Sequence, residues 1–434
     1  MGARETALNV LIACRKDGAW SNGALKEYIR RDRLDGREAA LASRLCYGVI
    51  QNRALLDSYL SQLLTGKLKD LHPAVRDILH LGLYQIYKMD KIPDSAAVNE
   101  SVALAKKYCR FPKASGLVNA VLRNAVRSAG TLREPQTLAV LYSHPQELVD
   151  LLKSYVGEEN LENTLRANNE IPPIAIQVNT LKTTADVLIA SLRDAGVTVK
   201  EHTIVPDCLI LENTGNIEAL PDFQKGHFYV QDPASRLSVL CADIQKGHRV
   251  LDCCSAPGGK SFAAALCGAE ELISCDVHPH KVELLRSGAQ RLGITHMYPR
   301  LQDATEFVPE WENAMDRVIA DVPCSGYGII RKKPDIRYKS PDFMRELPEL
   351  QLKILQNQCR YVKPGGILLY STCTLVRREN EGVVERFLKE NPNFVPEPLP
   401  LPEVMGRNEN GMTFLIPGKY NTDGFFICRL WRKE

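Results

Sequence analysis

RVLDCCSAPGGKS, residues 249–261, is the stretch that decides the fold of the C-terminal half. It begins with a short apolar run typical of a buried strand, and the glycine-bearing loop after it opens a helix. Strand-like and helical stretches then alternate to the C-terminus. This alternation predicts an α/β fold, a parallel sheet with right-handed crossovers and helices on both faces. The strand-like stretches are HRVLDCC, ELISCD, HMYPRLQD, DRVIADVP and GGILLYSTC, and a hairpin, TFLIP…DGFFICRLW, ends the chain.

The carboxyl ends of these strands are where ligands bind in such a sheet, near the point where the strand order reverses. The loop CCSAPGGKS, residues 253–261, lacks the G-x-G-x-x-G pattern, which disfavours NAD. It also differs from a phosphate-binding P-loop, because Cys254 stands where the first glycine would be. Two glycines at a helix N-terminus suit a smaller anionic group, such as an amino-acid carboxylate.

Acidic residues follow three of the predicted strands. Asp276 lies about 20 residues after the loop, where an acid accepts hydrogen bonds from ribose hydroxyls. Asp303 ends the third strand and is placed to hold an adenine edge, and Asp321 ends the fourth strand. Each acid alone is equally well explained as a cap of the next helix, but three acids and the loop at successive strand ends favour a site. A ribose and an amino-acid tail together predict S-adenosylmethionine as the cofactor.

Two cysteines also stand at strand ends, Cys324 in RVIADVPCSG and Cys373 in GGILLYSTCT. Neighbouring strands lie about 4.8 Å apart, so both thiols can face one pocket. Two buried, inert cysteines are the alternative, but the flanking proline, glycines and hydroxyl residues are typical of a loop at a pocket mouth. Beside a methyl-sulfonium cofactor, a thiolate that adds to C6 of cytosine makes C5 nucleophilic, and Asp321 is placed to hydrogen-bond N3. One thiol suffices for the addition, and a second can assist the elimination.

Residues 228–434 resemble the Nol1/Nop2/Sun family of RNA 5-methylcytosine methyltransferases. The resemblance rests on QDPASRLS, LDCCSAPGGKS, SCDVHPHKVELL, LQDAT, DVPCSGYGIIRKKPDIR, VKPGGILLYSTCTL and ENE at 379–381. It implies a class I, Rossmann-like S-adenosylmethionine-dependent methyltransferase domain without a metal, with Cys373 as the nucleophile and Cys324 in product release. DNA cytosine methyltransferases use the Pro-Cys thiol instead, so spacing alone leaves the two roles open. The implied cofactor positions are Cys254, Ser255, Ala256, Pro257, Gly258, Gly259, Lys260, Asp276, Asp303 and Asp321, although packing at the helix start would also explain Lys260.

The N-terminal part of the chain is basic. Residues 1–130 carry 21 Lys and Arg against 12 Asp and Glu, a net charge of +9 in a chain whose total is +3. This favours an anionic partner, most commonly nucleic acid, although a solvated helical surface explains it equally well. Apolar residues at helical spacing predict a bundle with helices over 37–64, 72–89, 94–108 and 114–126.

The stretch LHPAVRDILHLGLYQIYKMDKIPDSAAVNESVALAKKY resembles the NusB-like RNA-binding helical domain. Domains of this type also dock onto proteins, which is the alternative to RNA. Between the bundle and the last domain, short strand-like runs surround one helix, TADVLIASLRDAG. We therefore predict an all-α NusB-like domain over 1–140, a linker helix and small α+β, RRM-like segment over 141–227, and the methyltransferase domain over 228–434.

Joined in this order, the parts resemble the bacterial 16S rRNA cytosine-C5 methyltransferases of the Sun (Fmu, RsmB) type. The resemblance implies 16S rRNA as the partner of a cytoplasmic monomer. A tRNA methyltransferase of the same family and a non-catalytic RNA-binding or assembly protein are the alternatives. The sequence has no apolar run that would span a membrane, and its 13 cysteines show neither disulfide nor zinc-ligand spacing. Candidate RNA contacts are Arg30, Arg31, Arg33 and Arg331–Lys333, although solvated charge is the safer interpretation of both runs.

Overall fold

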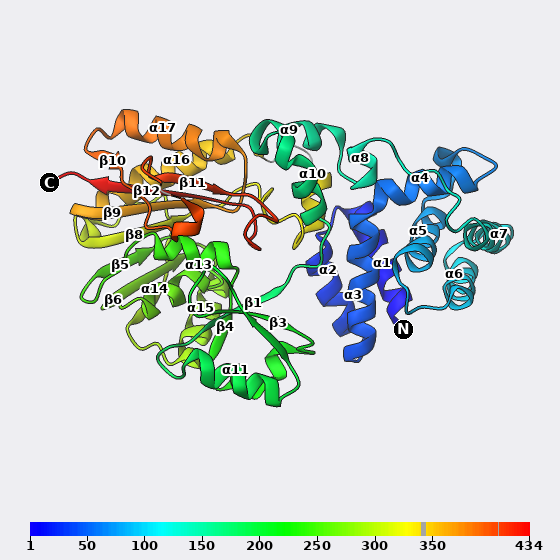
Figure 1. Cartoon of the computed structure of the whole chain (residues 1–434), viewed down its shortest axis with the longest axis horizontal. Helices are drawn as coiled ribbons and strands as arrows, with labels where there is room; N and C mark the ends of the chain where they lie inside the picture. The colour runs from blue at the N-terminus through cyan, green and yellow to red at the C-terminus, as the bar shows by residue number, and fades with distance from the viewer. Residues whose placement is uncertain (340–343, 407) are drawn as a thin grey trace. The chain divides into compact units, whose positions relative to one another are not determined.

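The computed structural model describes residues 1–339, 344–406 and 408–434. They form two compact units, drawn in Figure 1. One unit comprises residues 1–170 together with 330–339, and the other comprises the remaining described residues. Within the described part of the chain, no helix is long and apolar enough to cross a membrane. The domain boundaries at 140 and 227 stay predictions.

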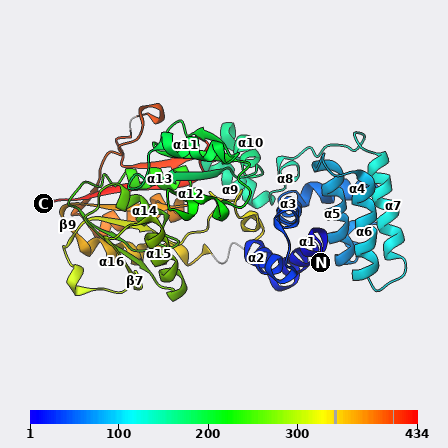
Figure 2. The same cartoon turned by 90° about the horizontal axis from the view of Figure 1, so that it is seen from below.

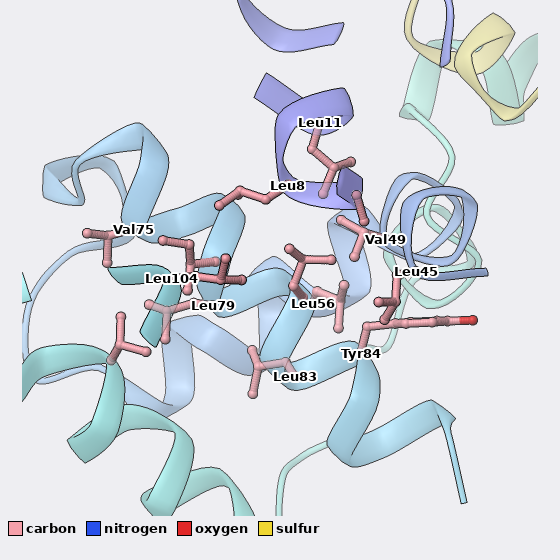
Figure 3. Close-up of a cluster of buried hydrophobic side chains, with 14 of the residues drawn as sticks. Leu8, Leu11, Leu45, Val49, Leu56, Val75, Leu79, Leu83, Tyr84 and Leu104 are labelled. Carbon is pink, nitrogen blue, oxygen red and sulfur yellow. The ribbon is translucent and has the colours of Figure 1, made fainter. Parts of the chain in front are cut away.

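The first unit is helical, and helices α1 to α7 each bury apolar residues in a shared core. Figure 3 shows this core, where Leu8, Leu56 and Leu79 lie among other buried side chains. Helices α5, α6 and α7 pack side by side in both views of Figures 1 and 2. The stretch predicted as one helix over 37–64 is two helices, which meet at Asn52. The helices are α1 (Ala3–Asp17), α2 (Ser21–Asp32), α3 (Gly36–Gln51), α4 (Arg53–Leu63), α5 (Pro73–Lys88), α6 (Asp94–Tyr108), α7 (Ala114–Arg127), α8 (Leu138–Leu141), α9 (Gln146–Val156) and α10 (Glu158–Ala167).

A segment from far along the chain completes this helical unit. Residues 330–339 contain the short 3-10 helix η4 (Pro334–Tyr338), and Arg337 on it is 3% exposed. Its guanidinium donates hydrogen bonds to the carbonyl oxygens of Gln51, Ser143 and Asn168 at 3.1, 3.1 and 3.2 Å. Burial lowers the pKa of Arg337 to about 10, so the group remains charged at neutral pH. Arg337 therefore joins three separate parts of the helical unit.

Arg337→Met is expected to destabilise this unit by about 3 kcal/mol, because buried carbonyl groups lose a charged donor. Urea unfolding of the full chain, followed by the circular dichroism signal of its helices, measures the loss in the free energy of unfolding. Lys333→Met is the control, since Lys333 lies in the same segment with an exposed side chain. Equal unfolding midpoints for the two variants would contradict the assignment of Arg337 as a structural link.

A small antiparallel sheet opens the second unit. Its strand order is β2-β3-β1-β4, and helix α11 (Ala185–Asp194) packs on it through Leu188 and Leu192. Both residues are fully buried beside apolar residues of the central strands, which explains why the strand-like runs seen in the sequence form a layer of sheet and helix. The strands are β1 (Ile174–Val178), β2 (Thr198–Glu201), β3 (Cys208–Glu212) and β4 (Phe228–Val230).

The larger sheet of the second unit has the order β10-β12-β9-β8-β5-β6-β7, with β11 paired to β12. Strands β5 to β9 run parallel, as the alternating pattern predicts. Strand β12 pairs antiparallel with β9, β10 and β11, which makes the sheet mixed. The strand order reverses between β5 and β8, which is where such sheets bind ligands. The strands are β5 (Arg249–Asp252), β6 (Glu271–Asp276), β7 (Met297–Leu301), β8 (Met315–Asp321), β9 (Val362–Thr372), β10 (Phe394–Pro396), β11 (Met412–Leu415) and β12 (Phe425–Arg432).

Successive residues of the central strands enter two different cores, because side chains alternate across a sheet. On β5, Val250 packs with residues of α13, α14 and α15, whereas Leu251 packs with residues of α16 and α17. Figure 1 shows these two groups of helices on opposite sides of the sheet. The apolar strand residues therefore pack both faces of the sheet against helices. Polar side chains can lie at the strand ends, outside these two cores. The helices are α12 (Pro221–Gln224), α13 (Pro233–Leu240), α14 (Gly259–Leu266), α15 (Pro279–Leu292), α16 (Leu347–Gln358) and α17 (Glu381–Glu390).

Candidate functional site

Two thiols meet at the carboxyl ends of β8 and β9. These strands pair in parallel, with Asp321 beside Ser371, so the loops that follow them begin side by side. The Sγ atoms of Cys324 and Cys373 lie 3.2 Å apart, within hydrogen-bonding distance, and both residues are half-buried free cysteines. The hydrogen bond with Cys373, together with burial and the charges of Glu379 and Asp321, raises the pKa of the Cys324 thiol well above its ordinary value.

The loop after Cys324 returns to the backbone of Cys373. The Gly328 N–H donates to the Cys373 carbonyl oxygen at 3.0 Å, and the Gly424 N–H donates to the Gly328 carbonyl oxygen at 2.8 Å. A Cβ atom at Gly328 would lie 1.9 Å from the Gly424 carbonyl oxygen, so only glycine permits this approach. Gly328, four residues after Cys324, thus allows the two cysteine loops to approach each other.

An ion pair lies beside the thiols. Asp321 ends β8, and its Oδ2 atom accepts a hydrogen bond from Lys260 Nζ at 2.7 Å. Its Oδ1 atom accepts from Ser371 Oγ at 2.9 Å. Lys260 is buried at the start of α14, where it also donates to Ser235 Oγ at 2.9 Å and lies 5.0 Å from the centre of the Phe425 ring. Lys260, a cofactor position implied by the family resemblance, is therefore the charge partner of Asp321.

The loop after β5 is fastened to the neighbouring strand. Ser255 donates to the Cys275 carbonyl oxygen through both its N–H and its hydroxyl group, at 2.8 and 2.9 Å. Gly258 has a φ of +117°, and a Cβ atom there would lie 2.3 Å from the Phe262 ring. Packing against Phe262 therefore requires this glycine, in addition to any ligand that approaches it. The Phe262 N–H bonds to the Gly258 carbonyl oxygen at 2.8 Å, and the amides just before it are those that a helix leaves without intrahelical partners.

The two remaining acids follow β6 and β7, on the other side of this loop from the thiols. Asp276 is buried at the end of β6, accepts from the His278 N–H at 3.0 Å and lies 3.5 Å from Lys281 Nζ. Asp303 accepts from the N–H and the hydroxyl group of Thr305, both at 2.8 Å. The backbone hydrogen bond and then the hydroxyl hydrogen bond lower the pKa of Asp303. Both acids thus also accept hydrogen bonds within local turns. This is the kind of capping role that is the alternative to ligand binding for each acid alone.

Several polar residues of the site were not singled out from the sequence. Ser371 lies two residues before Cys373, and the period of two along a strand could have suggested it. Ser235 lies in the motif QDPASRLS, but its contact with Lys260 depends on packing between α13 and α14. Asp252 ends β5 and is fully buried, and burial raises its pKa to about 7 while Ser261 Oγ donates to it at 2.7 Å. Hydrophobic periodicity gives no signal for these contacts.

The candidate RNA contacts separate in the structure. Arg30, Arg31 and Arg33 are exposed on the helical unit, and Arg31 pairs with Asp32 at 2.8 Å. Arg331 is 4% exposed, so its prediction as a solvated charge is wrong, whereas Lys333 in the same run is exposed. Arg331 and Lys333 both lie in the segment 330–339, which belongs to the helical unit. Among the described residues, no cluster of three or more His, Cys, Asp and Glu side chains is arranged to hold a metal ion.

Three protein families match successive parts of the chain. Residues 239–431 match the family described as 16S rRNA methyltransferase RsmB/F. Residues 1–127 match the NusB family, and residues 144–218 match the ferredoxin-like domain of RsmF/B-like methyltransferases. The β2-β3-β1-β4 sheet belongs to this ferredoxin-like part, although β4 lies beyond the matched residues.

Known proteins resemble the chain over nearly its whole length. The probable ribosomal RNA small subunit methyltransferase B of Bacillus subtilis is 36% identical over 99% of this chain and 98% of its own. The ribosomal RNA small subunit methyltransferase B of Vibrio cholerae is 34% identical over 92% of this chain and 90% of its own. Among solved structures, PH0851 has a TM-score of 0.80 at 25% identity, over 100% of this chain and 99% of its own. The chain belongs to the RsmB/F family of 16S rRNA methyltransferases.

Proposed function

We propose that the protein transfers a methyl group from S-adenosylmethionine to C5 of a cytosine in 16S rRNA. One observation carries the proposal: two thiols 3.2 Å apart lie at the strand ends, close to the ion pair between the buried Lys260 and Asp321. The two thiols supply a nucleophile and an S–H donor, and the ion pair supplies charged groups that can hydrogen-bond the ring of the base. The family to which the chain belongs supports the rRNA substrate.

The residues at the other strand ends fit the proposed cofactor. The cofactor supplies an electrophilic methyl group when it is bound. The free amides at the start of α14 suit its carboxylate, and the buried carboxylate of Asp276 suits its ribose hydroxyls. We assign the adenine edge to Asp303, which follows the next strand. We assign the rest of the loop contacts to Cys254, Ser255, Ala256, Pro257, Gly258 and Gly259.

The first chemical step forms a bond between Cys373 Sγ and C6 of the cytosine. The electrons of the C5–C6 double bond move toward C4, and those of the C4–N3 double bond move to N3, which takes up a proton. Asp321 hydrogen-bonds N3, and the ammonium group of Lys260 supplies the proton through Asp321, because the two groups already share a 2.7 Å hydrogen bond. C5 is then an enamine carbon able to accept the methyl group.

Release of the product reverses the thiol addition. The proton on C5 leaves to a base, the C6–S bond breaks, and the C5–C6 double bond forms again. N3 returns its proton through Asp321 to Lys260, so the base leaves neutral. Cys324 keeps its proton because its pKa is raised, so its S–H group can donate to Cys373 Sγ as negative charge returns to that atom. Cys324 therefore assists elimination without acting as the first nucleophile.

Methyl transfer to isolated RNAs tests the proposal directly. The protein is incubated with methyl-labelled S-adenosylmethionine and an unmodified 16S rRNA transcript, with a tRNA pool in parallel, and nucleosides are analysed by mass spectrometry. We expect label in 5-methylcytidine from 16S rRNA alone. Label in tRNA would favour the tRNA methyltransferase alternative, and label on another atom of the base would contradict the covalent chemistry.

The helical unit is proposed to bind RNA next to the methylated site. Its matched NusB family and its net charge of +9 over residues 1–130 support this role. The exposed Arg30, Arg31 and Arg33 are candidate contacts with phosphate groups. The target cytosine must leave its base stack to reach the thiols, so a single-stranded or flipped nucleotide is expected.

A further inference from the structure

Two adjacent polar residues, Glu379 and Asn380, are buried in the second unit near the thiols. Glu379 ends the short 3-10 helix η7 (Arg377–Glu379), and Asn380 directly precedes α17. Both residues are 0% exposed. Burying a carboxylate and an amide costs free energy unless hydrogen bonds compensate them. Their partners therefore show what these two residues hold in place.

Glu379 holds the backbone next to Cys324. Its Oε2 atom accepts a hydrogen bond from the N–H of Ser325 at 2.9 Å and another from Gln351 Nε2 at 3.1 Å. The same Gln351 amide donates to the carbonyl oxygen of Pro323 at 2.9 Å. The residues immediately before and after Cys324 are thus tied to one carboxylate, directly on one side and through Gln351 on the other.

Asn380 makes the matching contacts around Cys373. Its Oδ1 atom accepts a hydrogen bond from Thr372 Oγ1 at 2.6 Å. Its Nδ2 atom donates to the carbonyl oxygen of Thr374 at 3.0 Å. The residues before and after Cys373 are therefore bound by one side-chain amide, and Asn380 is covalently joined to Glu379.

The two cysteine loops are also joined directly. Ser325 follows Cys324 and Thr374 follows Cys373, and the hydroxyl groups of Ser325 and Thr374 are 2.7 Å apart. We propose that Glu379 and Asn380 are positioning residues that together hold Cys324 and Cys373 at hydrogen-bonding distance. The relevance of this spacing to catalysis rests on the proposed function, whereas the spacing itself can be measured without it.

The charge of Glu379 has a second consequence. It is one cause of the raised pKa of Cys324, after the hydrogen bond with Cys373 and burial. The other titratable groups around this thiol are Asp321 and Tyr370. Glu379→Gln keeps an oxygen that can accept from the Ser325 N–H but removes the negative charge. The pKa of Cys324 should then fall, and its thiolate form should appear at a lower pH than in the wild type.

The test measures thiol reactivity and kinetics in the full-length protein. Iodoacetamide modification of Cys324 and Cys373 is followed by mass spectrometry from neutral to alkaline pH, without RNA or cofactor. Glu379→Gln is expected to move the Cys324 profile to lower pH. Glu379→Ala and Asn380→Ala are expected to lower kcat roughly 100-fold with KM values for RNA and cofactor changed less than about threefold, because the thiols lose their positions. Glu385→Gln, an exposed change of the same kind on α17, is the control.

Two results would separate this inference from the proposed function. If the wild type methylates 16S rRNA but folded Glu379→Gln and Asn380→Ala match it in both kcat and alkylation profile, the positioning role is wrong and the function stands. If the wild type transfers no methyl group but Asn380→Ala changes the alkylation profiles of Cys324 and Cys373, the positioning role stands and the function is wrong. The nearly isosteric Asn380→Asp, which removes the donor to the Thr374 carbonyl oxygen, keeps the test decisive if an alanine variant fails to fold, which circular dichroism would show.

Discussion

Cys373→Ala is expected to abolish methyl transfer, and Cys324→Ala is expected to trap the protein on its RNA. The first change removes the sulfur that attacks C6, so kcat should fall on the order of 10⁴-fold or more, as for loss of other covalent nucleophiles. The second change leaves Cys373 able to attack but removes the S–H group 3.2 Å from its Sγ atom, so elimination slows. A denaturing gel with 16S rRNA and S-adenosylmethionine should show a covalent protein–RNA band for Cys324→Ala only.

Cys14→Ala is the control for this experiment. Cys14 is a free, half-buried cysteine like Cys324 and Cys373, but it lies on α1 in the helical unit. It should give no band and wild-type turnover. A band with Cys373→Ala and none with Cys324→Ala would exchange the proposed roles. If neither variant gives a band while the wild type still forms 5-methylcytidine, the proposed release step is wrong.

Lys260→Met is expected to lower kcat about 10³-fold, the size of effect seen when a preorganised polar group is lost from an active site. The change leaves Asp321 with Ser371 as its remaining hydrogen-bond donor among the described contacts, and it removes the ammonium group that supplies the proton to N3. Single-turnover methyl transfer to 16S rRNA measures the loss. Asp321→Asn should cause a similar loss, and the double variant should be little worse than either single variant, because the two residues act as one unit.

The matched control is Lys363→Met. Lys363 also pairs with an aspartate, Asp316, at 3.0 Å, but it lies near the amino ends of β8 and β9 instead of their carboxyl ends. It is expected to keep kcat within about threefold, because a partly exposed pair contributes little and lies away from the strand ends. Additive losses in Lys260→Met and Asp321→Asn would show that the lysine acts independently of Asp321.

Local sequence patterns predicted much of the architecture. Alternation of strand and helix after residue 248 predicted the parallel core, and apolar residues at helical spacing predicted the long helices of the first unit. These predictions succeed because periodicity is a property of neighbouring residues. They fail at details that depend on packing, such as the break at Asn52 within the stretch predicted as one helix.

The strand ends illustrate the limit at the site. The sequence placed Asp321, Cys324 and Cys373 after strands, but alternation alone does not say which strands pair. Only the order β9-β8-β5 brings Cys324 and Cys373, 49 residues apart, to 3.2 Å and leaves the loop after β5 beside them. The packing reason for Gly258 also depends on the tertiary structure. The ring of Phe262 occupies the space that a side chain at residue 258 would need, and periodicity does not reveal this contact.

The chain's own residues thus specified which groups stand at strand ends, and the tertiary structure decided which of them meet. Lys260 and Asp321 are 61 residues apart, and the hydrogen bond between Glu379 and Ser325 joins residues that are 54 positions apart. Nothing in the spacing of these residues along the chain marks them as partners. Each contact arises because apolar strand and helix faces bury together in one particular order, and that burial carries the polar side chains at the strand ends into hydrogen-bonding distance.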